Sequence, residues 1–215
     1  NGSKPYPLVK NFTSHEEEIT IDKKGLNKLF RALCSRAASG TCMLKGPLKR
    51  PLKNESRAGM SNRTAPTELL VLDIDGLHAL PTTDIKDMAQ RIVLQLPSIF
   101  HDVSYIAQAS ASLGLKKDTV SLHLFFLMDM PVYPKTLKDY LRNLNYECQF
   151  LAEQITLSAN GQSLSCVLDP SVADNSKLIY IAPPKFTGVK DPYPNGRFIK
   201  VDRGSAVLGI SSSLI

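Results

Sequence analysis

Apolar and polar residues along positions 68–169 follow two different periods, which together predict an alternation of strands and helices. Short unbroken apolar runs indicate buried strands, and apolar residues that recur every three or four positions indicate amphipathic helices. The predicted elements are a strand at 68–74, a helix at 83–96, strands at 103–109 and 119–128, a helix at 134–158 and a strand at 164–168. We expect Thr82 or Thr83 to cap the first of these helices, because a hydroxyl there can accept a hydrogen bond from a free backbone N–H.

The predicted order, βαββαβ, is that of the split βαβ or ferredoxin-like arrangement. Right-handed crossovers place its strands in the order fourth, first, third, second, with both helices on one face. Val71, Phe125 and Leu127 then point toward the open face, where apolar side chains need cover. The N-terminal part of the chain predicts a helix at 24–39 and a short strand at 41–44. We therefore expect a mixed α/β fold in which an N-terminal α/β segment packs on the open face of a βαββαβ core.

These elements divide the chain into three parts of one integrated domain. Residues 1–66 form the N-terminal segment, residues 67–185 the core, and residues 186–215 a C-terminal extension for which the sequence predicts no role. The chain has 215 residues, 43% of them apolar and 21% charged, which is typical of a soluble globular protein with a substantial core. No apolar run approaches the roughly 18 residues of a membrane helix, and the polar N-terminus does not resemble a secretory leader. We expect a cytoplasmic protein with no membrane partner.

The net charge favours a polyanionic partner, because the formal charge is +6 and the isoelectric point about 9.1. Much of the positive charge lies at positions 45–63, a stretch whose prolines and glycines exclude a regular helix. Two interpretations are open: an ordinary solvated loop, or a loop that binds the phosphates of a nucleic-acid template. The residues that would bind the template in the second case are Lys45, Lys49, Arg50, Lys53, Arg57 and Arg63.

The four cysteines, Cys34, Cys42, Cys148 and Cys166, form no C-x-x-C pair. Cys34 and Cys42 would need another His or Cys nearby to hold zinc, and the sequence provides none. We expect free thiols in a reducing compartment, with zinc binding by Cys34 and Cys42 as the alternative.

The first predicted strand ends in two carboxylates, Asp73 and Asp75, followed by Gly76. Side chains two positions apart in a strand share one face and lie about 6–7 Å apart along the chain. Two such acids repel each other and are costly to bury without a partner. A divalent cation removes that cost, and oxygen ligands suit Mg²⁺ or Mn²⁺. The alternative is a strand that simply ends in an acidic turn.

The predicted strand order brings other polar residues next to this acidic pair. Ser121 and His123 share one face of the third strand, and Asp169 ends the fourth, so both strands border the first at a spacing of about 4.8 Å. Three carboxylates that hold one or two divalent ions form a centre for phosphoryl transfer. A histidine and a serine, with a Lys or Arg, would then bind the β- and γ-phosphates of a nucleotide.

In this order, the motifs resemble those of the archaeo-eukaryotic primase superfamily, and within it the primase-polymerase domains of phages and mobile elements. That family carries an acid-x-acid pair on the first strand of an RRM-like core, then Ser-x-His, then an acid after an apolar strand. The corresponding residues here are Asp73-Ile-Asp75, Ser121-Leu-His123 and Leu168-Asp169. The resemblance covers roughly residues 40–185.

The resemblance implies a DNA primase or primase-polymerase that transfers nucleotides from NTPs or dNTPs on a single-stranded DNA template. It implies that Asp73, Asp75 and Asp169 ligate catalytic Mg²⁺ or Mn²⁺, and that Ser121 and His123 contact the triphosphate. Further phosphate contacts are expected from Ser110, Ser112, Lys116, Lys117 and Lys177, the last standing where some relatives have Arg. Relatives are often fused to a helicase, so a helicase domain in a longer protein is another expected partner.

Two other functions are open on the sequence alone. A strand followed by Asp-x-Asp-Gly also resembles the first motif of haloacid-dehalogenase-type phosphatases, in which Asp73 would be the nucleophile. Against this, Leu77 stands where that motif usually has Thr or Val, and the later paired-acid motif is missing. The third candidate is a non-catalytic RRM-like nucleic-acid-binding module. Such modules stack bases on aromatic residues of their central strands, where this chain has Asp73 and Asp75.

Overall fold

A four-stranded antiparallel sheet lies at the centre of the protein. A computed structural model describes residues 2–6, 8–79 and 81–213. In sheet order, the strands are β12 (Phe198–Val201), β6 (Tyr105–Ala109), β7 (Thr119–Val132) and β5 (Thr67–His78). The longest pairing joins β5 to β7, with Asp73 opposite His123. The predicted neighbours of the first three strands are therefore confirmed, and β12 joins the sheet at the outer edge of β6.

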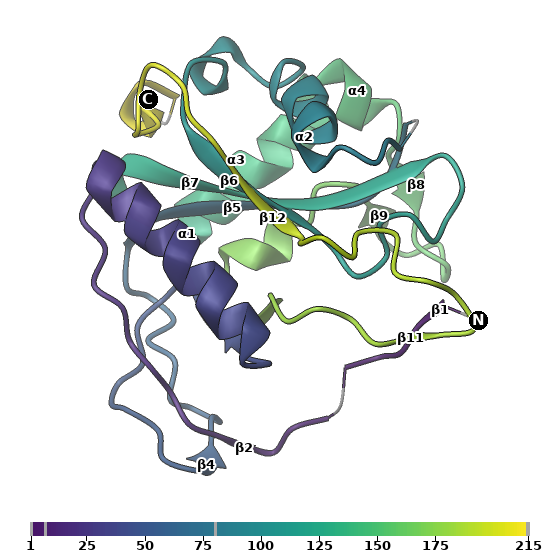
Figure 1. Cartoon of the computed structure of the whole chain (residues 1–215). Helices are drawn as coiled ribbons and strands as arrows, with labels where there is room; N and C mark the ends of the chain where they lie inside the picture. The colour runs from purple at the N-terminus through teal and green to yellow at the C-terminus, as the bar shows by residue number, and fades with distance from the viewer. Residues whose placement is uncertain (1, 7, 80, 214–215) are drawn as a thin grey trace.

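Helices cover both faces of this sheet. On one side lie α2 (Ile85–Val93) and α3 (Pro134–Glu147), and α1 (Lys23–Ala38) crosses the other side (Figure 1). The helix predicted at 24–39 is therefore confirmed, and the fold is a mixed α/β fold as expected. The carboxylate of Asp22 caps α1 by accepting a hydrogen bond from the Gly25 backbone at 2.7 Å.

The apolar side chains of both sheet faces belong to one core. Val71, Phe125 and Leu127, which the sequence predicted to point toward the open face, are each at most 2% exposed. They share this core with the buried leucines of α1 and with the apolar stripes of α2 and α3. The open face of the strands thus receives the cover that its apolar residues require.

The start of α2 differs from the prediction. The cap is Asp84, whose carboxylate accepts a hydrogen bond from the Lys86 backbone at 2.8 Å, and not Thr82 or Thr83. The Thr82 hydroxyl instead accepts a hydrogen bond from the backbone of Asp84 itself, at 3.2 Å. A carboxylate at this position also interacts favourably with the positive end of the helix dipole.

The helix predicted at 134–158 is wrong beyond Glu147. Cys148 has an extended conformation with ψ at 110°, which ends α3. The elements that follow are α4 (Gln149–Ala152) and a hairpin of β8 (Thr156–Leu157) and β9 (Leu164–Ser165). Leu151 lies beyond the break and is buried, so the apolar spacing runs on across the break. Periodicity alone could therefore not show where α3 ends.

The predicted fourth strand at 164–168 reaches the central sheet only at its end. Two backbone hydrogen bonds of 2.9 Å join residues 167–169 to residues 73–75 of β5, with Leu168 opposite Ile74 in an antiparallel bridge. This segment therefore borders β5 on the side away from β7, in the position that the predicted strand order gave it.

A bulge interrupts β5 at the acidic pair. The register with β7 shifts between Ile74 and Leu77, and Gly76 has a φ of +70°, a conformation that strains residues with a side chain. The Gly76 N–H donates a hydrogen bond to the Ser121 hydroxyl at 2.8 Å. Because a bulge changes the direction of nearby side chains, Asp73 and Asp75 contact different neighbours.

Short pairings and single turns tie the remaining segments to this frame. The pairings are β1 (Gly2–Ser3) with β11 (Phe186–Thr187), β2 (Asn11–Phe12) with β4 (Glu55–Ser56), and β3 (Cys42–Met43) with β10 (Ile179–Tyr180). The single turns are η1 (Ser98–Phe100), η2 (Pro170–Ala173) and η3 (Ile210–Ser213). Among the helices that the structure describes, none has the length and apolar character needed to cross a membrane.

Candidate functional site

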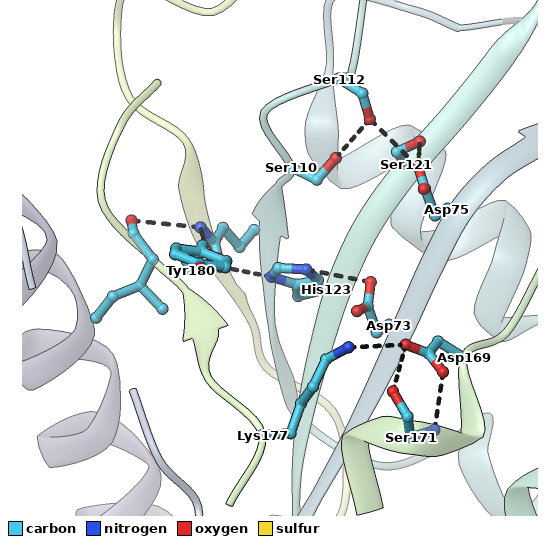
Figure 2. A network of polar contacts seen from close by, with 12 residues as sticks. Asp73, Asp75, Ser110, Ser112, Ser121, His123, Asp169, Ser171, Lys177 and Tyr180 are labelled. Atoms are coloured by element: carbon cyan, nitrogen blue, oxygen red, sulfur yellow. Dashed lines mark hydrogen bonds and ion pairs between the residues drawn. The ribbon is translucent and has the colours of Figure 1, made fainter. Parts of the chain in front are cut away.

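Seven of the ten residues predicted to bind metal or nucleotide line one cavity of about 850 Å³. They are Asp73, Asp75, Ser110, Ser112, His123, Asp169 and Lys177. These residues come from β5, from β7, from the turn after β6 and from the segment around η2. Figure 2 shows their contacts, which are grouped around Asp73, around Asp75 and around Asp169. Residues far apart in the sequence are therefore brought together as the strand order predicted.

The first group is a row of polar side chains that crosses the sheet. Asp169, Asp73, His123 and Gln108 occupy facing positions on four neighbouring strand segments. Asp73 Oδ1 lies 3.2 Å from His123 Nε2, and His123 Nδ1 lies 2.9 Å from Gln108 Oε1. Facing residues of antiparallel strands have Cα atoms about 4.5–5.5 Å apart, so the side chains of Asp73 and Asp169 leave neighbouring strand segments on the same face of the sheet.

Gln108 fixes the orientation of the His123 ring. Its amide nitrogen donates hydrogen bonds to the carbonyls of Tyr180 and Ile181, at 3.1 and 3.3 Å, so its oxygen faces the imidazole. Because an amide oxygen only accepts, Nδ1 of His123 carries a proton in this contact and Nε2 faces Asp73. Both side chains are buried, which holds the ring in this position.

The second group is built at the bulge, around Asp75. Its Oδ1 accepts hydrogen bonds from the hydroxyls of Ser121 and Ser112, at 2.9 and 3.3 Å. The Ser112 hydroxyl is in turn 3.1 Å from that of Ser110. The three serines predicted as phosphate contacts thus converge on Asp75, whereas Asp73 contacts His123.

Arg197, from the C-terminal extension, supports the corner that holds Ser110. It is 6% exposed and donates hydrogen bonds to the Ser110 carbonyl at 2.8 Å and to the Asp191 carboxylate at 2.7 Å. The rings of Phe186 and Tyr193 also lie against its guanidinium. Residues 186–215, for which the sequence predicted no role, therefore position one wall of the cavity.

The carboxylate of Asp169 is held by its own segment. It accepts hydrogen bonds from the Ser171 backbone at 2.8 Å and from the Ser171 hydroxyl at 2.7 Å, and Lys177 Nζ lies 3.4 Å away. Partial burial acts to raise the pKa of Asp169, but the Ser171 hydrogen bonds and the Lys177 charge outweigh it and lower the pKa below its ordinary value. Asp169 is therefore charged at neutral pH.

The donor chemistry of the cavity fits a hard divalent cation. Asp73 and Asp169 offer carboxylate oxygens from facing positions, and these are the ligands that Mg²⁺ and Mn²⁺ take. Within the described ranges, no three His, Cys, Asp or Glu side chains are grouped as a ready metal site, and Asp75 is turned to Ser121. The residues that could hold a cation are therefore Asp73 and Asp169, with Asp75 as the nearest further carboxylate along β5.

Three cavity residues on α3 were missed in the sequence. Lys138, Arg142 and Tyr146 line the cavity and follow one another at four-residue spacing, which places them on one face of the helix. The signal was present as two basic residues and an aromatic residue on the polar side of an amphipathic helix. Gln108 was missed because it lies in a strand whose residues are all buried, where nothing distinguishes it before the register is known.

Several predicted basic residues lie away from this cavity. Lys116 and Lys117 are exposed in the turn before β7 and do not line it. In the basic loop, Arg50 forms a bidentate ion pair with Glu55, with both contacts at 2.6 Å. The exposed basic residues of the loop are Lys49, Arg50, Lys53 and Arg63.

Lys45 is turned into the protein. Its ammonium donates hydrogen bonds to Asn175 Oδ1 at 2.9 Å and to the Thr67 hydroxyl at 3.3 Å. Burial lowers the pKa of Lys45 to about 8, against the raising effect of the Asp174 carboxylate. In this position Lys45 ties the start of the basic loop to the segment after η2.

This burial makes stability depend on pH. The pKa of Lys45 falls from 10.5 to about 8 on folding, so the unfolded chain binds more protons between these values and stability rises with pH. We expect the free energy of unfolding of the wild type, relative to that of Lys45→Gln, to increase as the pH rises from about 8 to about 10.5. Denaturant titrations across this window would measure it, and a constant difference would contradict it.

The four cysteines are free thiols. Cys166 lines the cavity beside Asp169, and Cys148 is buried behind α3. In the part of the chain that the structure describes, neither Cys34 nor Cys42 belongs to a group of side chains that could hold zinc.

Comparisons with known proteins give no match. No family model matches the chain, and neither a curated protein nor a solved structure matches it. The function has to be inferred from the cavity and its side chains.

Proposed function

We propose that the protein is a metal-dependent nucleotidyltransferase of the primase-polymerase type, which extends a strand from NTPs or dNTPs on a single-stranded DNA template. The observation that carries the proposal is the row of Asp169, Asp73 and His123 on neighbouring strand segments inside one cavity. Nucleotidyl transfer needs carboxylates for cations and, close by, cationic and hydrogen-bonding groups for a triphosphate. The cavity offers both.

The fold supports the same class. Residues 167–169, β5, β7 and β6 lie side by side in the order fourth, first, third, second of a βαββαβ arrangement. We propose that this is an RRM-like catalytic core, with the acidic pair on the strand between the third and fourth. Asp73 and Asp75, Ser121 and His123, and Asp169 then correspond to the three motifs of the archaeo-eukaryotic primases.

The proposed roles follow from the contacts of each side chain. Asp73 and Asp169 would hold the cation, and Asp75 would join them when its serine contacts exchange. Mg²⁺ or Mn²⁺, when bound, supplies charge neutralisation at the triphosphate and increases the acidity of an attacking hydroxyl. His123, held by Gln108, presents Nε2 to the cavity, and the imidazolium form of the ring would donate a hydrogen bond from Nε2 to a phosphate oxygen.

Positive charge in the lining of the cavity supports a polyphosphate substrate. Lys177 lies next to Asp169, and Lys138 and Arg142 of α3 line the same cavity. Charge-assisted hydrogen bonds from such groups are the usual means of binding phosphate oxygens. We propose that they bind the β- and γ-phosphates, which become the pyrophosphate that leaves.

A purely binding RRM-like module differs from this sheet, because among the described residues of β5 and β7 no Phe, Tyr or Trp side chain lines the cavity. Such a module stacks bases on exposed aromatic side chains of its central strands. On this face of the sheet, Phe125 of β7 pairs with Val71 of β5 and is fully buried in the core. The residues that face the cavity from these strands are acids and a histidine, which favours catalysis over stacking.

The test is incorporation of labelled nucleotides on single-stranded DNA with Mg²⁺ or Mn²⁺, with and without a primer. We expect metal-dependent product from the wild type and none from the Asp73→Ala/Asp75→Ala variant. Product without a primer would indicate de novo priming, and product only with a primer would indicate extension. Absence of product together with hydrolysis of a phosphomonoester that is lost in the same variant would overturn the proposal in favour of a phosphatase.

A further inference from the structure

A second cavity of about 650 Å³ adjoins the first. It lies within the N-terminal segment, between residues 8–12 and the basic loop, and its lining comes mainly from the ranges 8–12, 40–42 and 56–63. Tyr6, Leu178 and Tyr180 line both cavities. The two cavities therefore form one continuous hollow surface. The row of Asp169, Asp73 and His123 lies at one end and the basic loop at the other, and the two cavities meet at the two tyrosines.

The charge of the second cavity is positive. Lys10, Arg57 and Arg63 line it, and no Asp or Glu does so among the described residues. Arg57 is fixed in place, because its guanidinium lies 5.5 Å from the centre of the Phe12 ring and donates a hydrogen bond to the Ser176 carbonyl at 2.8 Å. Arg63 is exposed, and its charge also acts on the Asp174 carboxylate, whose pKa it helps to lower.

Stacked aromatic rings mark the junction of the two cavities. The rings of Tyr6 and Tyr180 are nearly parallel, 4.3 Å apart at an angle of 11°. The Tyr6 hydroxyl is anchored to the Ala182 carbonyl at 2.8 Å, and the carbonyl of Tyr180 accepts a hydrogen bond from Gln108. Tyr180 is 44% exposed, so part of a rigid flat surface faces the solvent-filled space beside His123.

We propose that this second cavity binds single-stranded nucleic acid and leads it to the acidic site. The phosphates would contact Arg57, Arg63 and Lys10, and a base would stack against the Tyr6–Tyr180 pair. The proposal rests on the proposed function and adds to it the path of the strand. A groove that combines backbone cations with aromatic platforms is how proteins bind single strands without sequence preference, because every base has a flat face.

The same features narrow the prediction for the basic loop. Of its six basic residues, only Arg57 and Arg63 line the second cavity, while Lys45 is half-buried and bonded to Asn175, and Arg50 is paired with Glu55. Lys49 is exposed on the loop and lines neither cavity. We therefore infer that the strand lies on the inner side of the loop, toward the N-terminal segment.

The test measures the affinity of a fluorescently labelled oligothymidylate by anisotropy, in EDTA and without nucleotide. Tyr180→Leu should weaken binding roughly tenfold or more, because it removes one stacking platform, whereas Tyr180→Phe keeps the ring and should bind like the wild type. Arg63→Gln should weaken binding and reduce the slope of log affinity against log salt by about 0.7. Lys49→Gln is the matched control, with the same charge change on the same loop but outside the cavity.

Two results would overturn the inference. One is normal binding by Tyr180→Leu and Arg63→Gln, and the other is a loss with Lys49→Gln as large as that with Arg63→Gln, which would place the strand on the outer side of the loop. Circular dichroism and thermal melting of each variant would show whether it is folded.

The outcome is separable from that of the proposed function, because binding is measured without metal or nucleotide. Site-specific loss of binding by a protein that never incorporates nucleotides would support the strand path and contradict the polymerase. Nucleotide incorporation by a protein whose Tyr180→Leu and Arg63→Gln variants bind normally would contradict the strand path and support the proposed polymerase activity.

Discussion

Replacing Asp169 with asparagine is expected to reduce metal-dependent nucleotide incorporation by roughly a thousandfold, with the fold intact. The carboxylate faces Asp73 across the strand segments and is charged at neutral pH, so it is one of the two residues best placed to hold a cation. Asparagine has the same shape: its Oδ1 can still accept the hydrogen bond from the Ser171 backbone, and its Nδ2 can donate to the Ser171 hydroxyl, which keeps the turn at η2. The loss would therefore report the missing charge.

Asp174→Asn is a matched control for this change. Asp174 lies five residues further on and accepts the same two kinds of hydrogen bond, from the backbone and hydroxyl of Ser176, both at 2.8 Å. It does not line the first cavity. We expect Asp174→Asn to keep nearly all of the activity. Equal effects of the two substitutions, or an active Asp169→Asn variant, would remove Asp169 from the catalytic centre.

Replacing Asn145 with alanine is expected to lower the free energy of unfolding by about 3 kcal/mol. Asn145 is fully buried on α3, where its amide donates hydrogen bonds to the carbonyls of Leu141 and Leu168, at 3.0 and 2.8 Å, and accepts one from the Leu168 backbone at 3.3 Å. Alanine would leave the N–H and C=O of Leu168 buried without these partners, and each unpaired group costs about 1–3 kcal/mol. Chemical denaturation would measure the change.

The same substitution should reduce activity more than the fraction of folded protein explains. Asn145 forms hydrogen bonds with the backbone of Leu168, which directly precedes Asp169. Loss of these hydrogen bonds would loosen the segment that places Asp169 opposite Asp73. Asn143→Ala on the exposed side of α3 is the control, and its stability should change by at most about 0.5 kcal/mol. An Asn145→Ala variant that is as stable and active as the Asn143→Ala control would contradict the proposed role of the Asn145–Leu168 hydrogen bonds.

The strand core could be predicted from the sequence because its information is local and periodic. Two acids at positions i and i+2 must share one face of a strand, and the apolar alternation of β7 fixes the face of His123. The placement of Asp169 beside Asp73 needed only the handedness of the connections. The same reasoning could not show that Asp75 turns to Ser121, because the bulge at Gly76 is set by the pairing with β7 and not by local spacing.

Features that depend on residues distant in the sequence could not be predicted from it. The role of Gln108 exists only because β6 pairs with β7 in the register that puts it opposite His123, and because residues 180–181 pass close by. The end of α3 at Glu147 is set by packing, since the apolar spacing runs on through Leu151. In the same way, Arg197 is an ordinary basic residue until the C-terminal extension folds back against Ser110.

The position of β12 has a consequence for any shortened form of the protein. Its four residues pair with β6 along the outer edge of the sheet, so the N–H and C=O groups on that edge of β6 are occupied. A fragment that ends at residue 185, where the sequence alone places the end of the core, would leave this edge bare. An exposed edge of a buried, apolar strand is a template for pairing with other chains, so such a fragment is expected to aggregate more readily than the chain that includes β12.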